Sequence, residues 1–127
     1  QVSVSYLPDY KVMLVKAEHR YITQDVFKQT FGEILPLLDQ YPTEKMIFDK
    51  RAMRVFDQPS MIWYHIEWKP KAYEKGIKRH VKILPEDKVF RNSVNIGKEK
   101  IRREYTDFDE NRYNIVYKES LDEAIAG

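Results

Sequence analysis

The stretch that decides the fold is residues 45–84, KMIFDKRAMRVFDQPSMIWYHIEWKPKAYEKGIKRHVKIL. Its two ends, 45–49 and 81–84, have the short β-favouring pattern of buried strands. Between them, Asp57 is a good helix N-cap with Pro59 in the first turn, and Gly76 suits the C-terminal stop. The stretch therefore predicts a strand, a helix that Pro70 bends or interrupts, and a second strand.

The residues before this stretch predict a hairpin and a helix. Residues 2–6 and 12–15 read as strands, and the Pro8-Asp9 pair between them suits a turn. Thr23 caps a helix whose apolar positions recur at helical spacing. We expect Pro36 to kink this helix or end it early, because a proline ring crowds the carbonyl four residues before it, here that of Gly32.

The residues after this stretch predict a helix, a strand and a last helix. Asp87 caps a helix with one apolar face, residues 114–118 read as a strand, and Ser120 opens a capping box. Alternating strands and helices of these lengths imply a mainly parallel sheet with right-handed crossovers. The sequence thus predicts one α/β domain over residues 1–127, with a mixed sheet, an N-terminal antiparallel hairpin and helices on its faces.

Composition sets limits on the class of protein. The 127 residues suit one domain. The chain has no cysteine, which excludes disulfides and thiol nucleophiles and fits a reducing compartment, so we expect a cytoplasmic protein. No run approaches the ~18 apolar residues of a membrane span.

The positive charge is concentrated in residues 69–103, which carry 12 Lys and Arg against 4 Asp and Glu. Nucleic-acid binding would need these cations on one continuous face. Around the predicted third helix they spread in several directions, which is typical of a solvated helix surface. We therefore do not expect nucleic acid as the partner.

The chain resembles the bacterial STAS/SpoIIAA-like single-domain proteins. The likeness rests on the two early strands, the aspartate after the third strand, Trp63-x4-Trp68-x-Pro70, and Gly76-x-Lys78-Arg79 running into Leu84-Pro85-x-Asp87. The terminal Leu121-Asp122-Glu123-Ala124-Ile125 is similar as well. The resemblance implies a compact α/β fold without an assigned activity. The phosphorylated-serine motif of the anti-sigma-factor antagonists is absent, and Ser60 alone offers a hydroxyl near the start of the second helix.

No pattern of catalytic or metal-binding residues is present in the sequence. His19, His65 and His80 are scattered, so we expect no metal site, and His65 reads as a buried histidine with its hydrogen bonds satisfied. No Gly-x-Ser-x-Gly and no glycine-rich phosphate loop occur, so we expect neither an enzyme nor a cofactor.

Asp49 and Arg51 follow a strand at the edge where open α/β sheets bind ligands. We favour a local ion pair between Asp49 and a neighbouring arginine. A small enzyme that uses both residues is a further alternative, and it predicts a polar cleft beside the end of the third strand.

The two tryptophans divide between core and surface. Five residues separate them on one helix, so their rings face different directions. At ~100° per residue Trp68 borders the apolar arc, whereas Trp63 falls on the polar side. We favour packing of Trp63 against the loop 50–56 or the Pro70 ring. The alternative, a contact role for Trp63, predicts that its ring is substantially exposed.

The leading hypothesis is a non-enzymatic binding or regulatory module that acts through protein–protein contacts, with a second copy of the chain as one candidate partner. The candidate contact residues are Trp63, Ser60, Asp49 and Arg51. The alternative is an apolar-ligand or lipid-binding domain with an internal cavity lined by Phe27, Phe31, Ile62 and Tyr73.

Overall fold

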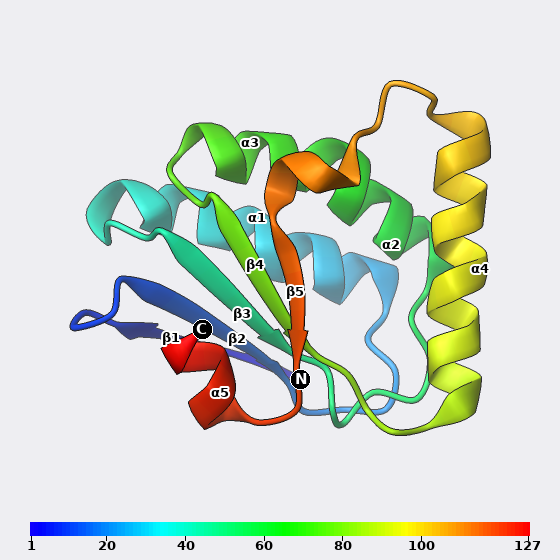
Figure 1. The fold of residues 1–127 in the computed structure, drawn as a ribbon, viewed down its shortest axis with the longest axis horizontal. Helices are drawn as coiled ribbons and strands as arrows, with labels where there is room; N and C mark the ends of the chain where they lie inside the picture. Colours follow the sequence, from blue (N-terminus) through cyan, green and yellow to red (C-terminus); the bar gives the residue numbers. More distant parts are fainter.

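The five strands lie in the sheet in the order in which they occur along the chain, as the computed structural model of the protein shows (Figure 1). The structure describes the backbone of residues 1–127 and every side chain except that of Glu110. The first pair is antiparallel and all later pairs are parallel. The predicted mixed sheet with an N-terminal hairpin is therefore confirmed. The strands are β1 (Val2–Leu7), β2 (Val12–Ala17), β3 (Lys45–Asp49), β4 (Arg79–Ile83) and β5 (Ile115–Lys118).

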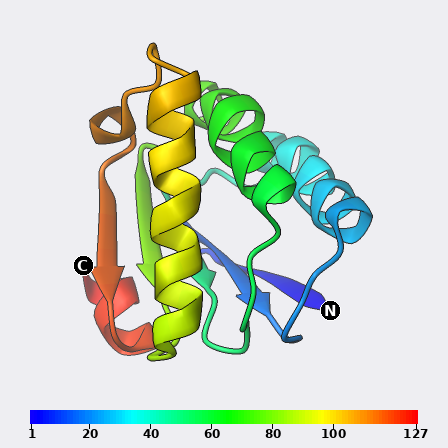
Figure 2. The same ribbon diagram turned by 90° about the vertical axis from the view of Figure 1, so that its right-hand side faces the viewer.

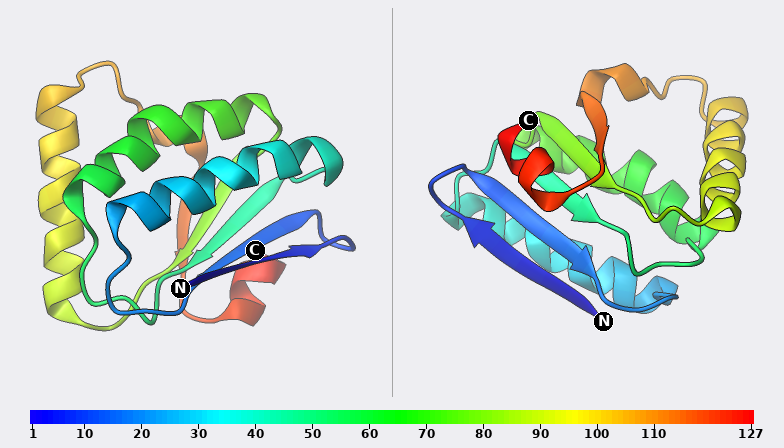
Figure 3. Two further views of the ribbon diagram at one scale, coloured as in Figure 1. Left: turned by 180° about the vertical axis from the view of Figure 1, so that it is seen from behind. Right: turned by 60° about the horizontal axis from the view of Figure 1, so that its bottom comes forward.

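Helices cover both faces of the sheet, but unequally. One face carries four α-helices and a π-helix between the second and third of them: α1 (Gln24–Gln40), α2 (Gln58–Trp63), the π-helix η1 (Tyr64–Trp68), α3 (Lys69–Glu74) and α4 (Lys88–Glu104). The 3₁₀-helix η2 (Glu110–Tyr113) precedes β5. The last helix, α5 (Leu121–Ala126), packs on the opposite face (Figure 3). The main core thus lies between the sheet and the α1–α4 layer (Figure 2).

The caps predicted from the sequence form as expected. The side chains of Thr23, Asp57, Asp87 and Ser120 each accept a hydrogen bond from a backbone N–H of the first helical turn. The expected early stop at Pro36 is wrong, because α1 continues to Gln40 and buries Leu38 in the core. Gly32 is exposed, so the carbonyl that Pro36 leaves unpaired faces solvent.

The interruption predicted at Pro70 takes the form of a π-helical turn. The N–H of Lys69 bonds to the carbonyl of Tyr64, five residues earlier, immediately before the proline that has no N–H to donate. Across α2, η1 and α3 the buried residues recur at steps of three and four. They are Ser60, Met61, Tyr64, His65, Trp68, Lys69 and Ala72. Two of these seven, His65 and Lys69, are basic side chains.

The two tryptophans differ in burial less than the sequence predicts. Trp68 is fully buried, and its Nε1–H donates to the carbonyl of Phe31 at 2.6 Å. Trp63 is half-buried rather than substantially exposed, so that prediction is wrong. Its ring meets the Phe27 ring edge-on at 6.2 Å between centroids, and Lys28 Nζ lies 5.9 Å from its centroid. The side chains of α1 give Trp63 a packing partner that the pattern of one helix does not reveal.

Truncating each tryptophan tests this assignment. Trp68→Ala should lower the free energy of unfolding by about 3–5 kcal/mol, because a buried ring and its hydrogen bond are lost. Trp63→Ala should lower it by about 1–3 kcal/mol, because only one side of the ring is packed. Urea unfolding measures both values. Equal losses for the two variants would contradict the assignment.

Candidate functional site

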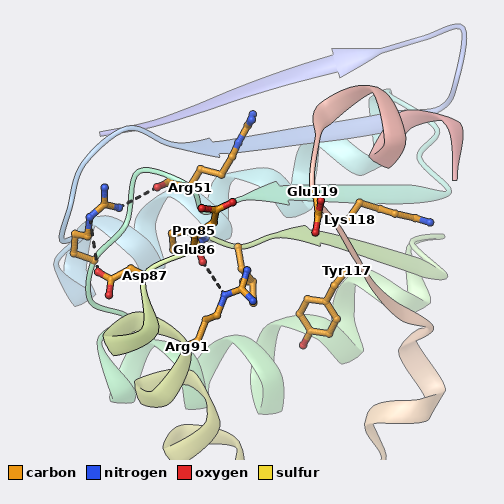
Figure 4. Close-up of a pocket in the computed structure, with 10 residues that line it drawn as sticks. Arg51, Pro85, Glu86, Asp87, Arg91, Tyr117, Lys118 and Glu119 are labelled. Atoms are coloured by element: carbon orange, nitrogen blue, oxygen red, sulfur yellow. Dashed lines mark hydrogen bonds and ion pairs between the residues drawn. The ribbon is translucent and has the colours of Figure 1, made fainter.

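A cavity of about 690 Å³ lies where the carboxyl ends of β3, β4 and β5 meet (Figure 4). The chain leaves β4 toward α4 on one face of the sheet and leaves β5 toward α5 on the other. Such a divergence of connections creates the crevice in which open α/β sheets bind ligands. Arg51, Arg54, Arg91 and Lys118 contribute cations to the lining, and Glu86, Asp87 and Glu119 contribute acids.

The cations of this edge cavity do not converge on one point. Arg54 donates to the carbonyls of Arg51 and Met53 and lies 3.9 Å from Asp87, while Arg91 Nε donates to the carbonyl of Pro85 at 2.9 Å. In Figure 4 the side chains of Arg51 and Lys118 extend away from Arg91. The cavity is polar and open, but its guanidinium groups are partly occupied within the protein and are not aimed at a common ligand.

Asp49 forms the local ion pair that the sequence favours. It is buried, and Arg51 donates to both of its oxygens, from Nε at 3.0 Å and from Nη2 at 2.7 Å. Burial alone would raise the pKa of Asp49, but the hydrogen bonds and the charge of Arg51 outweigh it and hold that pKa below its usual value. The cavity beside this strand is lined by Arg51, whereas Asp49 is not among its lining residues.

Ser60 is also unsuited to the contact role expected of it. Its side chain is fully buried, and its hydroxyl donates to Asp57 at 2.7 Å inside the cap of α2. Of the four candidate contact residues, only Arg51 is exposed.

A second group of polar side chains lies inside the protein, between the sheet and the π-helix. We call it the basic cluster: Lys50, His65, Lys69, His80 and Lys82. Each of these residues is at most 3% exposed. The cluster draws its members from three separate segments, the end of β3, the η1–α3 junction and the helix-facing side of β4.

Strand β4 carries opposite chemistry on its two faces. Val81 and Ile83 pack against α5, while His80 and Lys82 alternate with them and face the α1–α4 layer. Lys82 pairs in register with Phe48 on one side and Tyr117 on the other. A strand with one apolar and one basic face would ordinarily turn the basic face to water. Here helices cover that face, so the basic side chains are buried.

Aromatic rings surround the lysine amines. Lys50 Nζ lies 4.8 Å from the Phe48 centroid and 4.7 Å from that of Phe56. Lys69 Nζ lies 5.1 Å from the centroid of Tyr64, and Lys82 Nζ lies 5.3 Å from the same ring. Ring faces attract cations, but each such contact contributes only about 0.5–2 kcal/mol. This is less than the several kcal/mol by which removal from water disfavours an ammonium ion.

Several polar atoms of this region have no hydrogen-bond partner among the described residues. They are Lys69 Nζ, the Tyr64 hydroxyl and both ring nitrogens of His65 and of His80. The expectation that His65 is a satisfied buried histidine is therefore wrong. Buried polar groups are normally paired, so six unpaired atoms in one region indicate that a binding partner belongs there.

The charges in this region repel one another. Burial lowers the pKa of Lys50 and Lys69 well below the usual value, and the charges of Lys82 and Lys98 lower them further. Burial, followed by the charge of Lys69, likewise lowers the pKa of His65 and His80. No described acid forms an ion pair with Lys50 or Lys69. Without a ligand, burial and the neighbouring charges disfavour the protonated form of these amines.

The basic cluster was not predicted from the sequence, although a signal for it is present. His80 and Lys82 belong to the basic stretch 69–103, which was weighed only as a nucleic-acid surface. The spacing of Met61, His65, Lys69 and Ala72 follows one helical stripe. Two of the four residues in this stripe are basic, so the pattern indicates that the covered face of the helix carries a histidine and a lysine.

Replacing Lys69 tests whether its burial opposes folding. Lys69→Met keeps the side-chain length and removes an amine that has no partner, so it should raise the free energy of unfolding by about 1 kcal/mol or more. Lys71→Met, two residues along the same helix and exposed, is the matched control and should change stability by less than about 0.5 kcal/mol. Thermal unfolding in phosphate-free buffer measures both. A strongly destabilised Lys69→Met would contradict the assignment.

The stability of the ligand-free protein should rise with pH from about 6 to about 9. The lowered pKa values of His65, His80, Lys50 and Lys69 mean that the unfolded chain binds more protons than the folded one in this window. Stability then increases with pH, because a falling proton concentration disfavours the state that binds more protons. Above about pH 10 the trend should reverse, because burial raises the pKa of Tyr64. Urea midpoints measured across this range check the sign, and a fall between about pH 7 and 9 would refute it.

Comparison with known proteins adds no identity to these observations. No protein-family model matches the chain, and no curated protein matches it. Among the described residues no group of three His, Cys, Asp or Glu side chains could hold a metal ion. No helix in the described part of the chain has the length and apolar character needed to cross a membrane.

Proposed function

We propose that this protein is a non-enzymatic binding module whose ligand is a small tetrahedral oxyanion of the phosphate class, held by the basic cluster. One observation carries the proposal: three fully buried lysines and two buried histidines lie in one region, and six polar atoms there have no hydrogen-bond partner among the described residues. A multiply charged anion would neutralise the amines and accept their hydrogen bonds at the same time. Folding and binding would then be coupled through the same charges.

The types of donor favour phosphate over carboxylate. Lysine ammonium groups act as point charges that approach from several directions, whereas planar carboxylates are best matched by the fork of an arginine. In the cluster the lysines come from three different segments and the Tyr64 hydroxyl adds a neutral donor. Donors arranged around a point suit an anion with oxygens on all sides.

The other hypotheses have weaker support. The edge cavity has cations that are partly paired and that diverge. The protein-contact role of Trp63 stays a prediction. It relied on a substantially exposed ring, whereas the ring is half-buried. The rings of Phe27 and Phe31 are stacked at 4.4 Å and packed among Phe48, Tyr64 and Trp68, so they form filled core and not the wall of an apolar cavity.

Sulfate is the cleaner probe for the experiment, because it stays a dianion through the neutral range while phosphate itself titrates. Titration calorimetry of the wild-type protein with sulfate should show binding together with proton uptake, measured in two buffers of different ionisation enthalpy. Uptake follows because the anion returns protons to amines whose pKa values are lowered in its absence. The affinity should therefore fall as the pH rises from about 7 to about 9.

Two variants make this experiment specific. Lys69→Met should abolish sulfate binding, whereas Lys71→Met should leave it unchanged. Binding to exposed lysines would persist in Lys69→Met and would take up no protons near neutral pH. Either that pattern, or no binding of sulfate or phosphate by the wild-type protein, would overturn the proposal.

Membership of the STAS/SpoIIAA-like family, a cytoplasmic location and a protein or homodimer partner remain predictions. The shared α/β class is compatible with the family, but many unrelated functions use such folds. Anion binding and a regulatory role are compatible, because a ligand that stabilises one packing of the helices over the sheet also controls which surface those helices present.

A further inference from the structure

Two neighbouring cavities form a groove between α4 and the chain segment that runs from η2 into β5. Their volumes are about 240 Å³ and about 450 Å³, and both are lined by Lys98, Arg102 and Asn111. Figure 1 shows α4 standing beside this segment, joined to it by the loop at the top of the view. We call the smaller of the two cavities the α4 groove.

The α4 groove meets the basic cluster at His65. This histidine lines the groove, and both of its ring nitrogens lack partners among the described residues. Lys98 also lines the groove and hydrogen-bonds to the Tyr117 hydroxyl. Its charge contributes to lowering the pKa values of Lys50, His65 and Lys69, so it lies close to the basic cluster. A ligand with its anionic group at the cluster can therefore extend past His65 into the groove.

The walls of the groove differ in chemistry. Ile101 and Phe108 offer apolar surface, while Asp109 and Asn111 offer polar groups. A carbon skeleton bearing hydroxyl groups matches such walls, because its C–H faces can lie on the apolar side while its hydroxyls bond to the polar side. Inorganic phosphate alone would leave this surface unused.

We infer that the ligand is a phosphomonoester of a small polyhydroxylated molecule, a sugar phosphate in size, with its phosphoryl group in the basic cluster and its organic part in the α4 groove. The inference rests on the proposed function, since it places the phosphoryl group at that same site. We place the organic part in the smaller cavity, whose volume of about 240 Å³ limits its size. Drug-sized ligands need roughly 300 Å³ and more, so a nucleoside would have to extend into the neighbouring cavity of about 450 Å³.

The test compares four probes by titration calorimetry: ribose 5-phosphate, inorganic phosphate, ribose and adenosine monophosphate. The wild-type protein should bind ribose 5-phosphate about tenfold more tightly than inorganic phosphate, the effect of one or two added hydrogen bonds. Ribose alone should not bind measurably. Adenosine monophosphate should bind no better than ribose 5-phosphate, and tighter binding would overturn the size limit.

The variant Asn111→Ala locates the organic part. It should remove most of the advantage of ribose 5-phosphate and leave the affinity for inorganic phosphate unchanged, because the side chain of Asn111 lies in the groove. Asn95→Ala, on the exposed side of α4, is the matched control and should change neither affinity.

The outcomes separate the two proposals. Equal affinities for ribose 5-phosphate and inorganic phosphate would overturn the sugar-phosphate inference and leave the oxyanion site standing. An advantage that survives Asn111→Ala would overturn the placement in the groove. Failure of the wild-type protein to bind either phosphate compound would overturn both proposals.

Discussion

The packing of Trp68 against Phe31 is the constraint on which the rest of the structure depends. The two rings meet edge-on at 5.1 Å, and the indole donates to the Phe31 carbonyl, so one side chain ties the π-helix to α1 both by packing and by a hydrogen bond. A helix held at one residue cannot rotate independently at the next. With Trp68 turned into the core, Lys69 and His65 are also turned toward the sheet. The burial of these basic groups is therefore a consequence of the same contact that secures the fold.

The layer between the sheet and helices α1–α4 has two different halves, one well packed and apolar and the other electrostatically unfavourable. Toward β1–β3 the inner layer is aromatic and aliphatic, and its rings contact one another at 4.4–6.3 Å. Toward β4 and β5 the same layer contains Lys50 and Lys69, which form no ion pair with a described acid, and two histidines whose ring nitrogens have no partner among the described residues. Natural cores rarely keep unpaired polar groups unless function requires them, because each one opposes folding. The contrast between the two halves of one layer is the physical basis for assigning a ligand to the second half.

Much of the fold could be predicted from local sequence, but little of the site could. Caps at Thr23, Asp57, Asp87 and Ser120, the hairpin and the break before Pro70 all follow from short-range chemistry that one segment contains. The fate of Lys82 does not. Its strand alternates polar with apolar residues, which usually indicates one solvated face. Here α5 covers the apolar face, and the α1–α4 layer covers the face that carries Lys82. Trp63 illustrates the same limit, since its packing partner Phe27 belongs to another helix.

By itself the sequence determined the elements, their order and the parallel character of the sheet, because helix caps, β-branched runs and alternation act over a few residues. Only the tertiary structure decided which basic residues are buried and which remain in water. Lys69 and Lys71 are two positions apart on one helix, yet one is enclosed by aromatic rings and the other is exposed. That difference depends on the rotation of the helix about its axis, which the contact between Trp68 and Phe31 sets across 37 residues of chain.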